Sequence, residues 1–373
     1  MTMGSLFDGI GAFPLAASRF GIKPIWASEI EPSCLSVTKR HFPRMKHLGD
    51  ITKISGAGIK PVDIITFGSP CQDLSIAGKR EGLQGSRSNL FMEAARVIKE
   101  MRGKYGKPDY IVWENVPGAF SANGGKDFQT VIEEIARIAG TGISIPRPKK
   151  WLAAGTVMGD CWSLAWRVLD ARYWGVPQCR KRIFLVADFR GQSAPEILFK
   201  PGGLPWDSAE GKEAGEEAPA SAERGFRKAV GIDGYNQNLL PSYCIQGNTI
   251  GRSDNAGAAG KGVNKDVSFT LNTVDRHAVF KFQSFGQYKQ SDKSKTLMAC
   301  DDITTGDLVM DCFKVRRLTP LECERLMGFP DGWSELGHDN KPLSDTARYR
   351  ALGNSIAVPC AEFIVGRIGH GAY

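Results

Sequence analysis

The sequence predicts an α/β fold: a Rossmann-like, mainly parallel sheet with helices on both faces, joined to a smaller loop- and β-rich domain. Two observations predict the sheet. Short apolar runs alternate with helical patterns in the first half of the chain, and a glycine-rich turn follows the first residues. A third observation predicts the second domain, because beyond residue 190 the chain becomes polar and rich in Gly, Asn, Ser and Thr.

The strands of the sheet are predicted from four apolar runs bounded by glycine, proline or charged residues. These runs are Lys23–Ser28, Val62–Gly68, Asp109–Asn115 and Arg182–Phe189. Two helices are predicted between them, because apolar residues recur there at spacings of three and four. Their apolar faces run from Phe91 to Met101 and from Phe128 to Ile138. Alternating strands and helices favour a layered fold with parallel strands.

The second half of the chain begins with a polar segment, Trp206–Gly225, which we interpret as a linker. Residues 231–313 then predict a small domain of short strands and loops. In that domain Ser268–Val274 and Ser294–Cys300 resemble each other, and a repeated hairpin or a coincidence explains this equally well. A helix returns after Thr319: Pro320 suits its first position, Glu322 completes a capping box, and Gly328 ends it.

Composition limits the class of protein. The chain has 373 residues and a formal charge of +8, which fits a polyanionic partner such as nucleic acid. No stretch approaches the roughly 20 apolar residues of a membrane span, and the first residues do not resemble a signal peptide. The nine cysteines are scattered without a Cys-x-x-Cys pair, so we expect reduced thiols and no zinc site. A cytoplasmic protein is therefore predicted.

Three features at successive strand ends suggest a cofactor that contains adenosine. The turn Gly9-Ile10-Gly11 lies between a strand and a helix, where the backbone can approach a nucleotide. Glu29 follows about twenty residues later, where a carboxylate can hold ribose hydroxyls. Asp50 closes the next unit. By themselves these residues do not distinguish NAD from S-adenosylmethionine.

Cys71 stands just beyond a predicted strand, in the sequence "GSPCQDLSIAGKR". A buried, inert sulfur is the common fate of a cysteine. Here Pro70 stiffens the backbone, and the following loop combines glycines with basic residues: Gly78, Gly82 and Gly85 with Lys79, Arg80 and Arg87. Because ligands bind beyond the carboxyl ends of parallel strands, we interpret Cys71 as a nucleophile beside a loop that closes on an anion.

Charged residues also mark the ends of two further strands. Glu114 emerges from an apolar strand, where desolvation favours its protonated form, so it suits a general acid or a hydrogen-bond donor to a ring nitrogen. A helix-capping carboxylate is the alternative. Arg180 and Arg182 precede the last strand on the same side of the chain, which suits a phosphate or a carbonyl oxygen. A solvated basic strand end is the alternative for either one.

Taken in order, these motifs resemble the bacterial and phage DNA (cytosine-5) methyltransferases over nearly the whole chain. The motifs are "LFDGIG", "EIEPSCLS", "GDI", "GSPCQDLSIAG", "RSNLF", "ENVPG", "WGVPQCRKR", "RRLTPLECERLMGFP" and "RYRALGNSIAVP". Each one alone is modest, whereas the ordered set is specific. Ala12, Ser69 and Asn89 depart from the common pattern, and none of them removes a reacting group.

The resemblance implies a catalytic mechanism. The Cys71 thiolate attacks carbon 6 of a cytosine that has flipped out of the duplex, and carbon 5 takes a methyl group from S-adenosylmethionine. Glu114 would hold ring nitrogen 3 and the exocyclic amine. Arg182 would contact the carbonyl oxygen, and Arg180 would support the site. No metal ion is expected.

The resemblance also implies a cofactor pocket. Phe7 would lie against the adenine, the turn of Asp8, Gly9 and Gly11 around the methionine portion, and Glu29 on the ribose. Asp50 and Ile51 would frame the adenine. The remaining expected cofactor contacts are Ile30, Pro70, Leu90, Asn354 and Ser355.

The same resemblance divides the chain and predicts its DNA contacts. Residues 1–190 would form the catalytic domain, 191–339 the target-recognition domain, and 340–373 a return to the catalytic domain. The family's Thr-Leu motif occurs twice, as Thr270-Leu271 and as Thr296-Leu297, and we expect the second pair to read DNA. The other expected DNA contacts are Gln72, Ser75, Lys79, Arg87 and Arg252. The basic segment Ser144–Gly155 is interpreted as an exposed loop, with a DNA contact as the alternative.

The predicted function is methylation of carbon 5 of cytosine in a specific sequence of double-stranded DNA, by a monomer. Whether a cognate restriction endonuclease accompanies it is left open by the sequence. Three alternatives remain at this point. They are a tRNA cytosine-5 methyltransferase, an inactive DNA-binding relative, and an NAD-dependent oxidoreductase. The last would not need "SPCQ" or "QCRKR".

Overall fold

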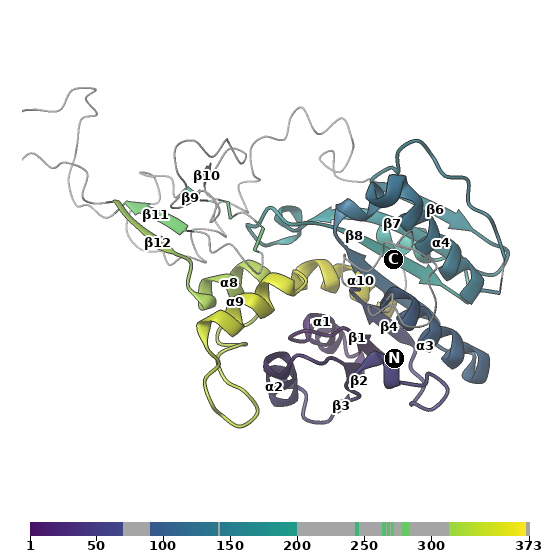
Figure 1. The fold of residues 1–373 in the computed structure, drawn as a ribbon, viewed down its shortest axis with the longest axis horizontal. Helices are drawn as coiled ribbons and strands as arrows, with labels where there is room; N and C mark the ends of the chain where they lie inside the picture. The colour runs from purple at the N-terminus through teal and green to yellow at the C-terminus, as the bar shows by residue number, and fades with distance from the viewer. Residues whose placement is uncertain are drawn as a thin grey trace, which may run out of the picture.

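The centre of the protein is an eight-stranded sheet, seen in a computed structural model (Figure 1). The structure describes residues 1–69, 90–140, 142–199, 243–245, 263–265, 267–268, 270–271, 278–282 and 313–370. The strand order is β3-β2-β1-β4-β5-β8-β7-β6. The strands are β1 (Thr2–Leu6), β2 (Lys23–Ser28), β3 (Lys46–His47), β4 (Ile64–Phe67), β5 (Tyr110–Asn115), β6 (Ala154–Met158), β7 (Ser163–Asp170) and β8 (Lys181–Asp188).

The direction of the strands brings several chain segments to one edge of the sheet. Strands β1 to β5 run parallel, so their carboxyl ends share that edge. Strand β8 runs antiparallel to β5 with Asn115 opposite Ile183, so the start of β8 lies beside the end of β5. Strand β7 pairs antiparallel with β8 and ends at the same edge. We call this the carboxyl edge.

Helices cover both faces of the sheet and form a three-layer fold. Helices α1 and α10 pack together on one face with α5, and α3 and α4 pack on the other. The helices are α1 (Ala12–Arg19), α2 (Pro32–His41), α3 (Leu90–Tyr105), α4 (Lys126–Ile138), α5 (Ala194–Leu198), α8 (Pro320–Met327), α9 (Asp345–Asn354) and α10 (Val358–His370). Short 3-10 turns are η1 (Ile51–Lys53), η3 (Pro117–Phe120), η4 (Ala122–Gly125) and η5 (Ala171–Trp174).

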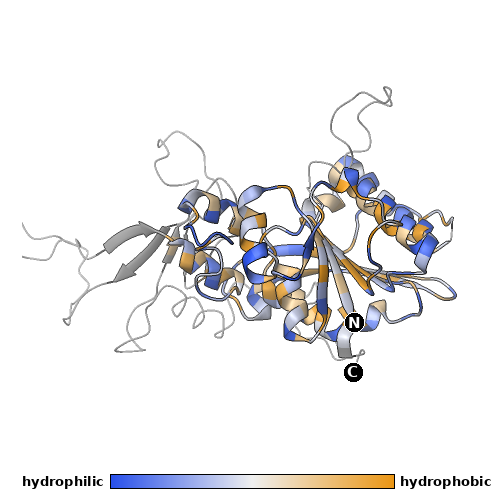
Figure 2. Ribbon diagram, turned by 90° about the horizontal axis from the view of Figure 1, so that it is seen from below, coloured by the Kyte–Doolittle hydropathy of each residue, from blue (hydrophilic) through white to orange (hydrophobic). Residues whose placement is uncertain are grey.

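Two apolar cores fill the space between the layers, and Figure 2 shows the apolar residues gathered on the central strands. The predicted helix faces account for much of one core. Phe91, Ala94, Ala95, Ile98 and Met101 of α3 are all buried. The predicted face of α4 is buried as well, from Phe128 to Ile138. The sequence pattern therefore predicted which side of each helix faces the sheet.

A second, four-stranded antiparallel sheet lies apart from the first (Figure 1). Its order is β10-β9-β11-β12, with β9 (Tyr243–Ile245), β10 (Val263–Lys265), β11 (Ala278–Phe282) and β12 (Phe313–Arg317). One bridge joins this region to the carboxyl edge, because Ser268 pairs with Gln178 just before β8. After β12 the chain returns to the core of the large sheet, through Leu318 and through Leu326 and Met327 of α8.

The predicted fold class is confirmed, with one difference in the sheet. All four predicted strands are present as β2, β4, β5 and β8. Strands β6 and β7 were not among the predicted runs, and the three pairings β5–β8, β8–β7 and β7–β6 are antiparallel. In β7 every residue but Val168 is buried, including the charged residues Arg167 and Asp170. These charged residues interrupt the apolar pattern from which a buried strand is predicted. The predicted capping box of Thr319 and Glu322 is confirmed at α8, which ends at Gly328 with a φ of 77°.

No single helix within the described part of the chain is long and apolar enough to cross a membrane. Helices Asp345–Asn354 and Val358–Gly369 pass that test only as a pair, by length and composition, with a bend of 45° between them.

Candidate active site

The glycine-rich turn after β1 has the backbone geometry that its sequence predicts. Gly9 and Gly11 have φ values of 57° and 83°, in the left-handed region that side chains rarely adopt. Phe7 also has a positive φ, of 55°. At Gly11 an added Cβ would lie 3.0 Å from the Phe42 ring and 3.2 Å from Thr38. The turn is therefore held close to α2 and leads directly into α1.

Glu29 at the end of β2 is bound to this turn. One oxygen, Oε2, accepts a hydrogen bond of 2.8 Å from the backbone N–H of Gly9. The other, Oε1, accepts from the backbone N–H groups of Ile30 and Glu31 at 2.8 and 2.9 Å. Glu29 thus joins the ends of β1 and β2 into one unit. Ile30 beside it is 70% exposed, which is unusual for a large apolar side chain and leaves it available to a ligand.

Asp8 is a buried carboxyl group whose charge is not balanced. Neither of its side-chain oxygens has a hydrogen-bond partner among the residues that the structure describes, and both are shielded from solvent. Burial raises its pKa to about 7, the charge of Glu29 adds to the rise, and the Ser5 hydroxyl opposes it. A buried carboxylate without a partner is costly, so this position suits a cationic ligand group.

Asp50, Ile51 and Leu90 lie at the edge of the same region, on different elements. Asp50 caps η1 by accepting from the N–H of Thr52 at 3.0 Å, which lowers its pKa. Ile51 is only 3% exposed and packs in the core. Leu90 is half-buried at the first position of α3.

The chain leaves β4 through two residues that β5 holds in place. The Ser69 hydroxyl accepts a hydrogen bond of 3.1 Å from the Trp113 indole N–H, and the Ser69 carbonyl accepts one of 3.2 Å from the Asn115 side chain. At Gly68 an added Cβ would lie 3.1 Å from Oε2 of Glu114. The backbone that leads into Pro70 and Cys71 is therefore fixed beside Glu114. The departure of Ser69 from the family pattern gains a structural reason here, as the acceptor for Trp113.

Glu114 and Arg182 form an ion pair where β5 ends and β8 begins. Arg182 Nε lies 3.1 Å from Glu114 Oε1, and the two side chains are 16% and 12% exposed. Burial raises the pKa of Glu114, while the charges of Arg182 and Arg180 and the hydrogen bond from Arg182 oppose the rise. A desolvated carboxyl group was expected at this position, and the upward shift agrees with that expectation.

Arg180 lies deeper and contacts the backbone of two distant segments. Its guanidinium donates to the carbonyl of Leu271 at 2.8 Å, to that of Gly353 at 3.0 Å, and to that of Ser355. It is only 2% exposed, and burial together with the charge of Arg182 lowers its pKa to about 9. Arg180 thus connects the carboxyl edge with the end of α9 and with residues 270–271.

Thr270 and Leu271, the first of the two Thr-Leu pairs, lie against the segment before β8. The Thr270 hydroxyl donates to the carbonyl of Cys179, and Leu271 is 6% exposed in the core. Asn354 is exposed at the end of α9, whereas Ser355 next to it is buried. These contacts bring residues far apart in sequence to the edge that holds Glu114.

Four cysteines outside the predicted nucleophile are held as thiols. Burial raises the pKa of Cys34 to about 12, and it also raises the pKa values of Cys179, Cys323 and Cys360. Because the thiolate is the reactive form, none of these four is a good nucleophile. Within the described part of the chain, no group of His, Cys, Asp and Glu side chains is arranged to hold a metal ion.

Several predicted site residues lie outside the described residues. They are the predicted nucleophile Cys71 with Pro70, and the expected DNA contacts Gln72, Ser75, Lys79, Arg87, Arg252, Thr296 and Leu297. Their roles stay predictions. Sequence reasoning also missed residues that shape the site, namely Gly68, Ser69, Trp113 and Trp333. Only Ser69 gave a signal, as a departure from the family pattern, because the others act through contacts between distant segments.

Trp333 is the clearest of these missed residues. Its indole N–H donates a 2.8 Å hydrogen bond to the carbonyl of Ile10, in the middle of the glycine turn. Its ring stacks on His41, with centroids 3.6 Å apart. A residue more than three hundred positions away thus supports the turn.

A Rossmann-like sheet whose carboxyl edge carries a glycine turn, a carboxylate held by backbone N–H groups and a largely buried ion pair is typical of α/β enzymes that bind nucleosides. The model of the C-5 cytosine-specific DNA methylases matches residues 1–370. The chain belongs to this family, and it is a DNA (cytosine-5) methyltransferase.

Curated relatives cover almost the whole chain at low identity. The type II methyltransferase M.HhaI of Haemophilus parahaemolyticus is 26% identical over 98% of this chain and 93% of its own length. M.DsaV of Dactylococcopsis salina is 26% identical over 97% of this chain and 84% of its own length. A protein of Escherichia phage P1 named DNA N-6-adenine-methyltransferase is 29% identical over 98% of this chain. The chain spans only 60% of that phage protein.

Solved structures share the fold. The methyltransferase Dnmt2 of S. pombe superposes with a TM-score of 0.58 at 18% identity, over 98% of this chain and 97% of that one. A putative DNA modification methyltransferase encoded within an E. coli prophage superposes with a TM-score of 0.52 at 17% identity, over 99% and 98%. At these identities the similarity shows the fold alone.

Proposed function

We propose that this enzyme methylates carbon 5 of a cytosine flipped out of a specific duplex sequence, through a covalent bond between Cys71 and carbon 6. The observation that carries the proposal is the Glu114–Arg182 pair, 3.1 Å apart and largely buried at the carboxyl edge. Gly68 and Ser69, which lead directly into Pro70 and Cys71, lie against Glu114 and its neighbours. An acid, a cation and the approach to a thiol thus meet at one edge.

S-adenosylmethionine fits the residues on the cofactor side of that edge. Its α-ammonium group supplies the cation that the buried, unpartnered Asp8 carboxyl group lacks. Glu29 keeps an acceptor position for a ribose hydroxyl on Oε2, which accepts only from Gly9, whereas Oε1 already accepts two hydrogen bonds. Phe7, Ile30, Asp50, Ile51 and Leu90 would line the adenosine portion, with Asn354 and Ser355 at the far side. When bound, the sulfonium supplies the methyl group that carbon 5 receives.

In the proposed reaction Cys71, Glu114 and Arg182 have separate roles. The Cys71 thiolate forms a bond to carbon 6, and the ring electrons shift toward nitrogen 3 and the carbonyl oxygen. Glu114 in its protonated form donates to nitrogen 3, and Arg182 donates to the carbonyl oxygen, so the charge on the ring is stabilised. After carbon 5 is methylated, its proton leaves to solvent base. The carbon–sulfur bond breaks, the thiolate is restored, and nitrogen 3 returns its proton to Glu114.

The proposed role of Arg180 is to hold these parts together. It contacts carbonyls of Leu271, Gly353 and Ser355 rather than facing Glu114 with a hydrogen bond.

The proposed domains are residues 1–190, 191–339 and 340–373. The burial of Leu318, Leu326 and Trp333 in the core around α1 favours a return to the catalytic domain nearer residue 318.

The proposed partner is double-stranded DNA, in line with the DNA-modifying family and the formal charge of +8. The proposal includes the following DNA contacts: Gln72, Ser75, Lys79, Arg87, Arg252, Thr296 and Leu297. Thr270-Leu271 is added as a candidate because it lies against Cys179 and Arg180. The protein is further proposed to act as a monomer in the cytoplasm, with or without a cognate restriction endonuclease.

The name of the phage P1 relative introduces a second candidate, methylation of adenine N6. That reaction methylates an exocyclic amine and needs no bond between a thiol and the ring. The family match and the position of Glu114 and Arg182 favour cytosine. Since the chain spans 60% of that relative, the named activity is not assigned to the shared part.

One experiment separates these possibilities. The protein is incubated with tritiated S-adenosylmethionine and either plasmid DNA or tRNA, and the labelled nucleosides are identified after digestion. We expect 5-methylcytosine in DNA only; N6-methyladenine, or label in tRNA alone, contradicts the proposal. Bisulfite sequencing of the plasmid then gives the target sequence. A duplex with 5-fluorocytosine at that target should form a complex stable to denaturation, and its absence contradicts the covalent route.

A further inference from the structure

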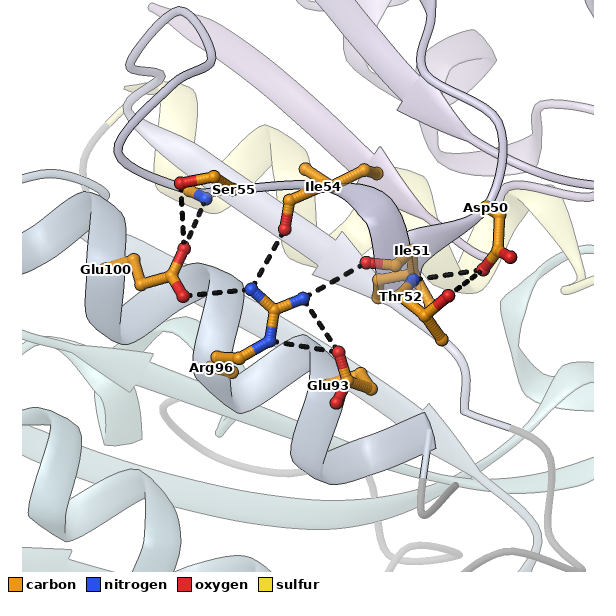
Figure 3. A network of polar contacts seen from close by, with 9 residues as sticks. Asp50, Ile51, Thr52, Ile54, Ser55, Glu93, Arg96 and Glu100 are labelled. Carbon is orange, nitrogen blue, oxygen red and sulfur yellow. Dashed lines mark hydrogen bonds and ion pairs between the residues drawn. The ribbon is translucent and has the colours of Figure 1, made fainter. Parts of the chain in front are cut away.

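The strongest feature outside the reacting groups is a polar network between α3 and the segment Asp50–Gly56 (Figure 3). Arg96 of α3 is its centre. Its Nη1 donates to the carbonyl of Ile54 at 2.9 Å, and its Nη2 donates to the carbonyl of Ile51 at 3.2 Å. Both acceptors are backbone atoms of the turn that Asp50 caps. The network therefore holds a loop by its main chain.

Every N–H group of the Arg96 guanidinium has an acceptor. Besides the two carbonyls, Nε and Nη2 donate to Oε2 of Glu93 at 2.9 and 2.7 Å, and Nη1 donates to Oε1 of Glu100 at 2.9 Å. These are five bonds for the five donors that a guanidinium has. A lysine has three donors from one atom and reproduces the charge but not this planar arrangement.

Glu100 adds a second connection to the same segment. Its Oε2 accepts from the backbone N–H of Gly56 at 2.8 Å and from the Ser55 hydroxyl at 3.2 Å. Gly56 itself touches α3, since an added Cβ there would lie 1.9 Å from the carbonyl oxygen of Val97. Residues 50–56 are therefore attached to α3 at Ile51, Ile54, Ser55 and Gly56, from one end to the other.

We propose that Arg96 is a positioning residue for the cofactor, which fixes the Asp50–Ile51 side of the adenosine pocket relative to Leu90 at the start of α3. The inference rests on the proposed function, because that function assigns Asp50, Ile51 and Leu90 to the pocket. Arg96 itself does not touch the cofactor. Its side chain is 34% exposed, so the network is not part of the core.

The test uses Arg96→Lys, which keeps the charge and removes the planar set of donors. Arg137→Lys is the matched control: Arg137 pairs with Glu133 and Glu134, four and three residues before it on α4, away from residues 50–56. Kd for S-adenosylmethionine is measured by calorimetry on the full chain. We expect Arg96→Lys to raise it about three- to tenfold and Arg137→Lys to leave it within about twofold.

A second readout distinguishes positioning from general damage. In steady-state assays Arg96→Lys should raise KM for S-adenosylmethionine, while KM for DNA and kcat at saturating cofactor stay within about twofold of the parent values. Should KM for DNA and kcat change as much as KM for the cofactor, Arg96 supports the fold as a whole and the inference is wrong. Glu100→Gln, which keeps the shape of the side chain, should give the same split with a smaller change.

The adenosine side is tested with 5′-methylthioadenosine, which carries the base and ribose without the amino acid. Arg96→Lys should weaken its binding by the same factor as that of S-adenosylmethionine, whereas Asp8→Asn should weaken only the latter. If Arg96→Lys leaves 5′-methylthioadenosine binding unchanged, the inference is overturned. If the parent protein binds neither compound, the proposed function fails first, and the two failures are thus distinguishable.

Discussion

The carboxyl edge has two halves, one with Asp8 and the other with Glu114 and Arg182. The buried carboxyl groups of these two halves have opposite electrostatic surroundings. On the cofactor half, Asp8 is buried with no hydrogen-bond partner among the described residues, and its pKa is raised to about 7. On the other half, Glu114 is buried beside Arg182 at 3.1 Å, with Arg180 close enough to oppose the rise of its pKa. Burial raises the pKa of both groups. Arginine charges oppose the rise at Glu114, whereas at Asp8 the charge of Glu29 adds to it and only the Ser5 hydroxyl opposes it.

The difference indicates what each half needs from its ligand. Asp8 lacks a cation, so a positively charged ligand group removes the cost of its burial. Glu114 already has cations, so it suits a neutral base with hydrogen-bond donors and acceptors on one side, which it shares with Arg182. On the proposed function, the first half binds the amino acid portion of S-adenosylmethionine and the second binds cytosine.

The largest expected effect is that of Cys71→Ser, which tests whether the half with Glu114 and Arg182 works by covalent chemistry. A serine hydroxyl is a much weaker nucleophile than a thiolate at neutral pH, so methylation should fall by roughly 10⁴-fold or more. Cofactor binding should remain within about twofold, because the pocket on the other half is untouched. Tritium transfer and calorimetry measure the two. Full turnover by the variant is incompatible with the covalent route.

Glu114→Gln should produce the next largest effect. Glutamine keeps the shape and a hydrogen bond to the ring but cannot supply a proton to nitrogen 3. We expect the single-turnover rate to fall about 10²- to 10³-fold. The control is Glu133→Gln on α4, a carboxyl group that binds the N–H of Ile145 away from the edge. Equal losses in both variants would mean that stability, not proton supply, explains the result.

The sequence predicted the local geometry of the glycine turn and of Glu29 better than the contacts between distant segments. Gly9, Gly11 and Glu29 act locally or across one hydrogen bond, and their spacing alone pointed to a nucleoside site. Arg180 was expected to support the site because it lies two residues before Arg182 in the sequence. Its actual contacts, to the carbonyls of Leu271 and Gly353, join segments that no spacing rule relates.

One interior strand of the sheet also escaped prediction. Strand β7 pairs with both β6 and β8 and is almost entirely buried, although it contains the charged residues Arg167 and Asp170. Arg167 donates to the carbonyl of Leu198 at 2.8 Å, which gives one of its N–H groups a partner inside the fold. Such a strand is recognised only when the partner of each charge is known. The Arg96 network was likewise invisible, because its acceptors are backbone carbonyls.

Asp8→Asn tests the cofactor half and should have an intermediate effect. Asparagine removes the charge that the α-ammonium group would neutralise, so Kd for S-adenosylmethionine should rise about 10- to 100-fold. KM for DNA should change little, because Glu114 and Arg182 remain. Calorimetry and steady-state kinetics separate the two. A variant that binds S-adenosylmethionine as tightly as the parent would assign Asp8 to the fold rather than to the ligand.

The smallest effect concerns pH and follows from the same carboxyl group. The pKa of Asp8 is raised from 3.8 to about 7 in the free protein, so lowering the pH from 7.5 to 6.0 protonates most of the carboxylate before the cofactor arrives. Only the charged form attracts an ammonium group, so Kd for S-adenosylmethionine should rise roughly eightfold over that range.

Asp8→Asn provides the control for this titration, because asparagine has no proton to gain between pH 7.5 and 6.0. Its weaker binding should be nearly flat across the range, and 5′-methylthioadenosine should bind the parent protein equally well at both ends. If the parent and the variant show the same slope, another group titrates and the contrast between the two buried carboxyl groups is lost. If only the parent shows it, the unpaired carboxyl group of Asp8 is the one that meets the cation of the ligand.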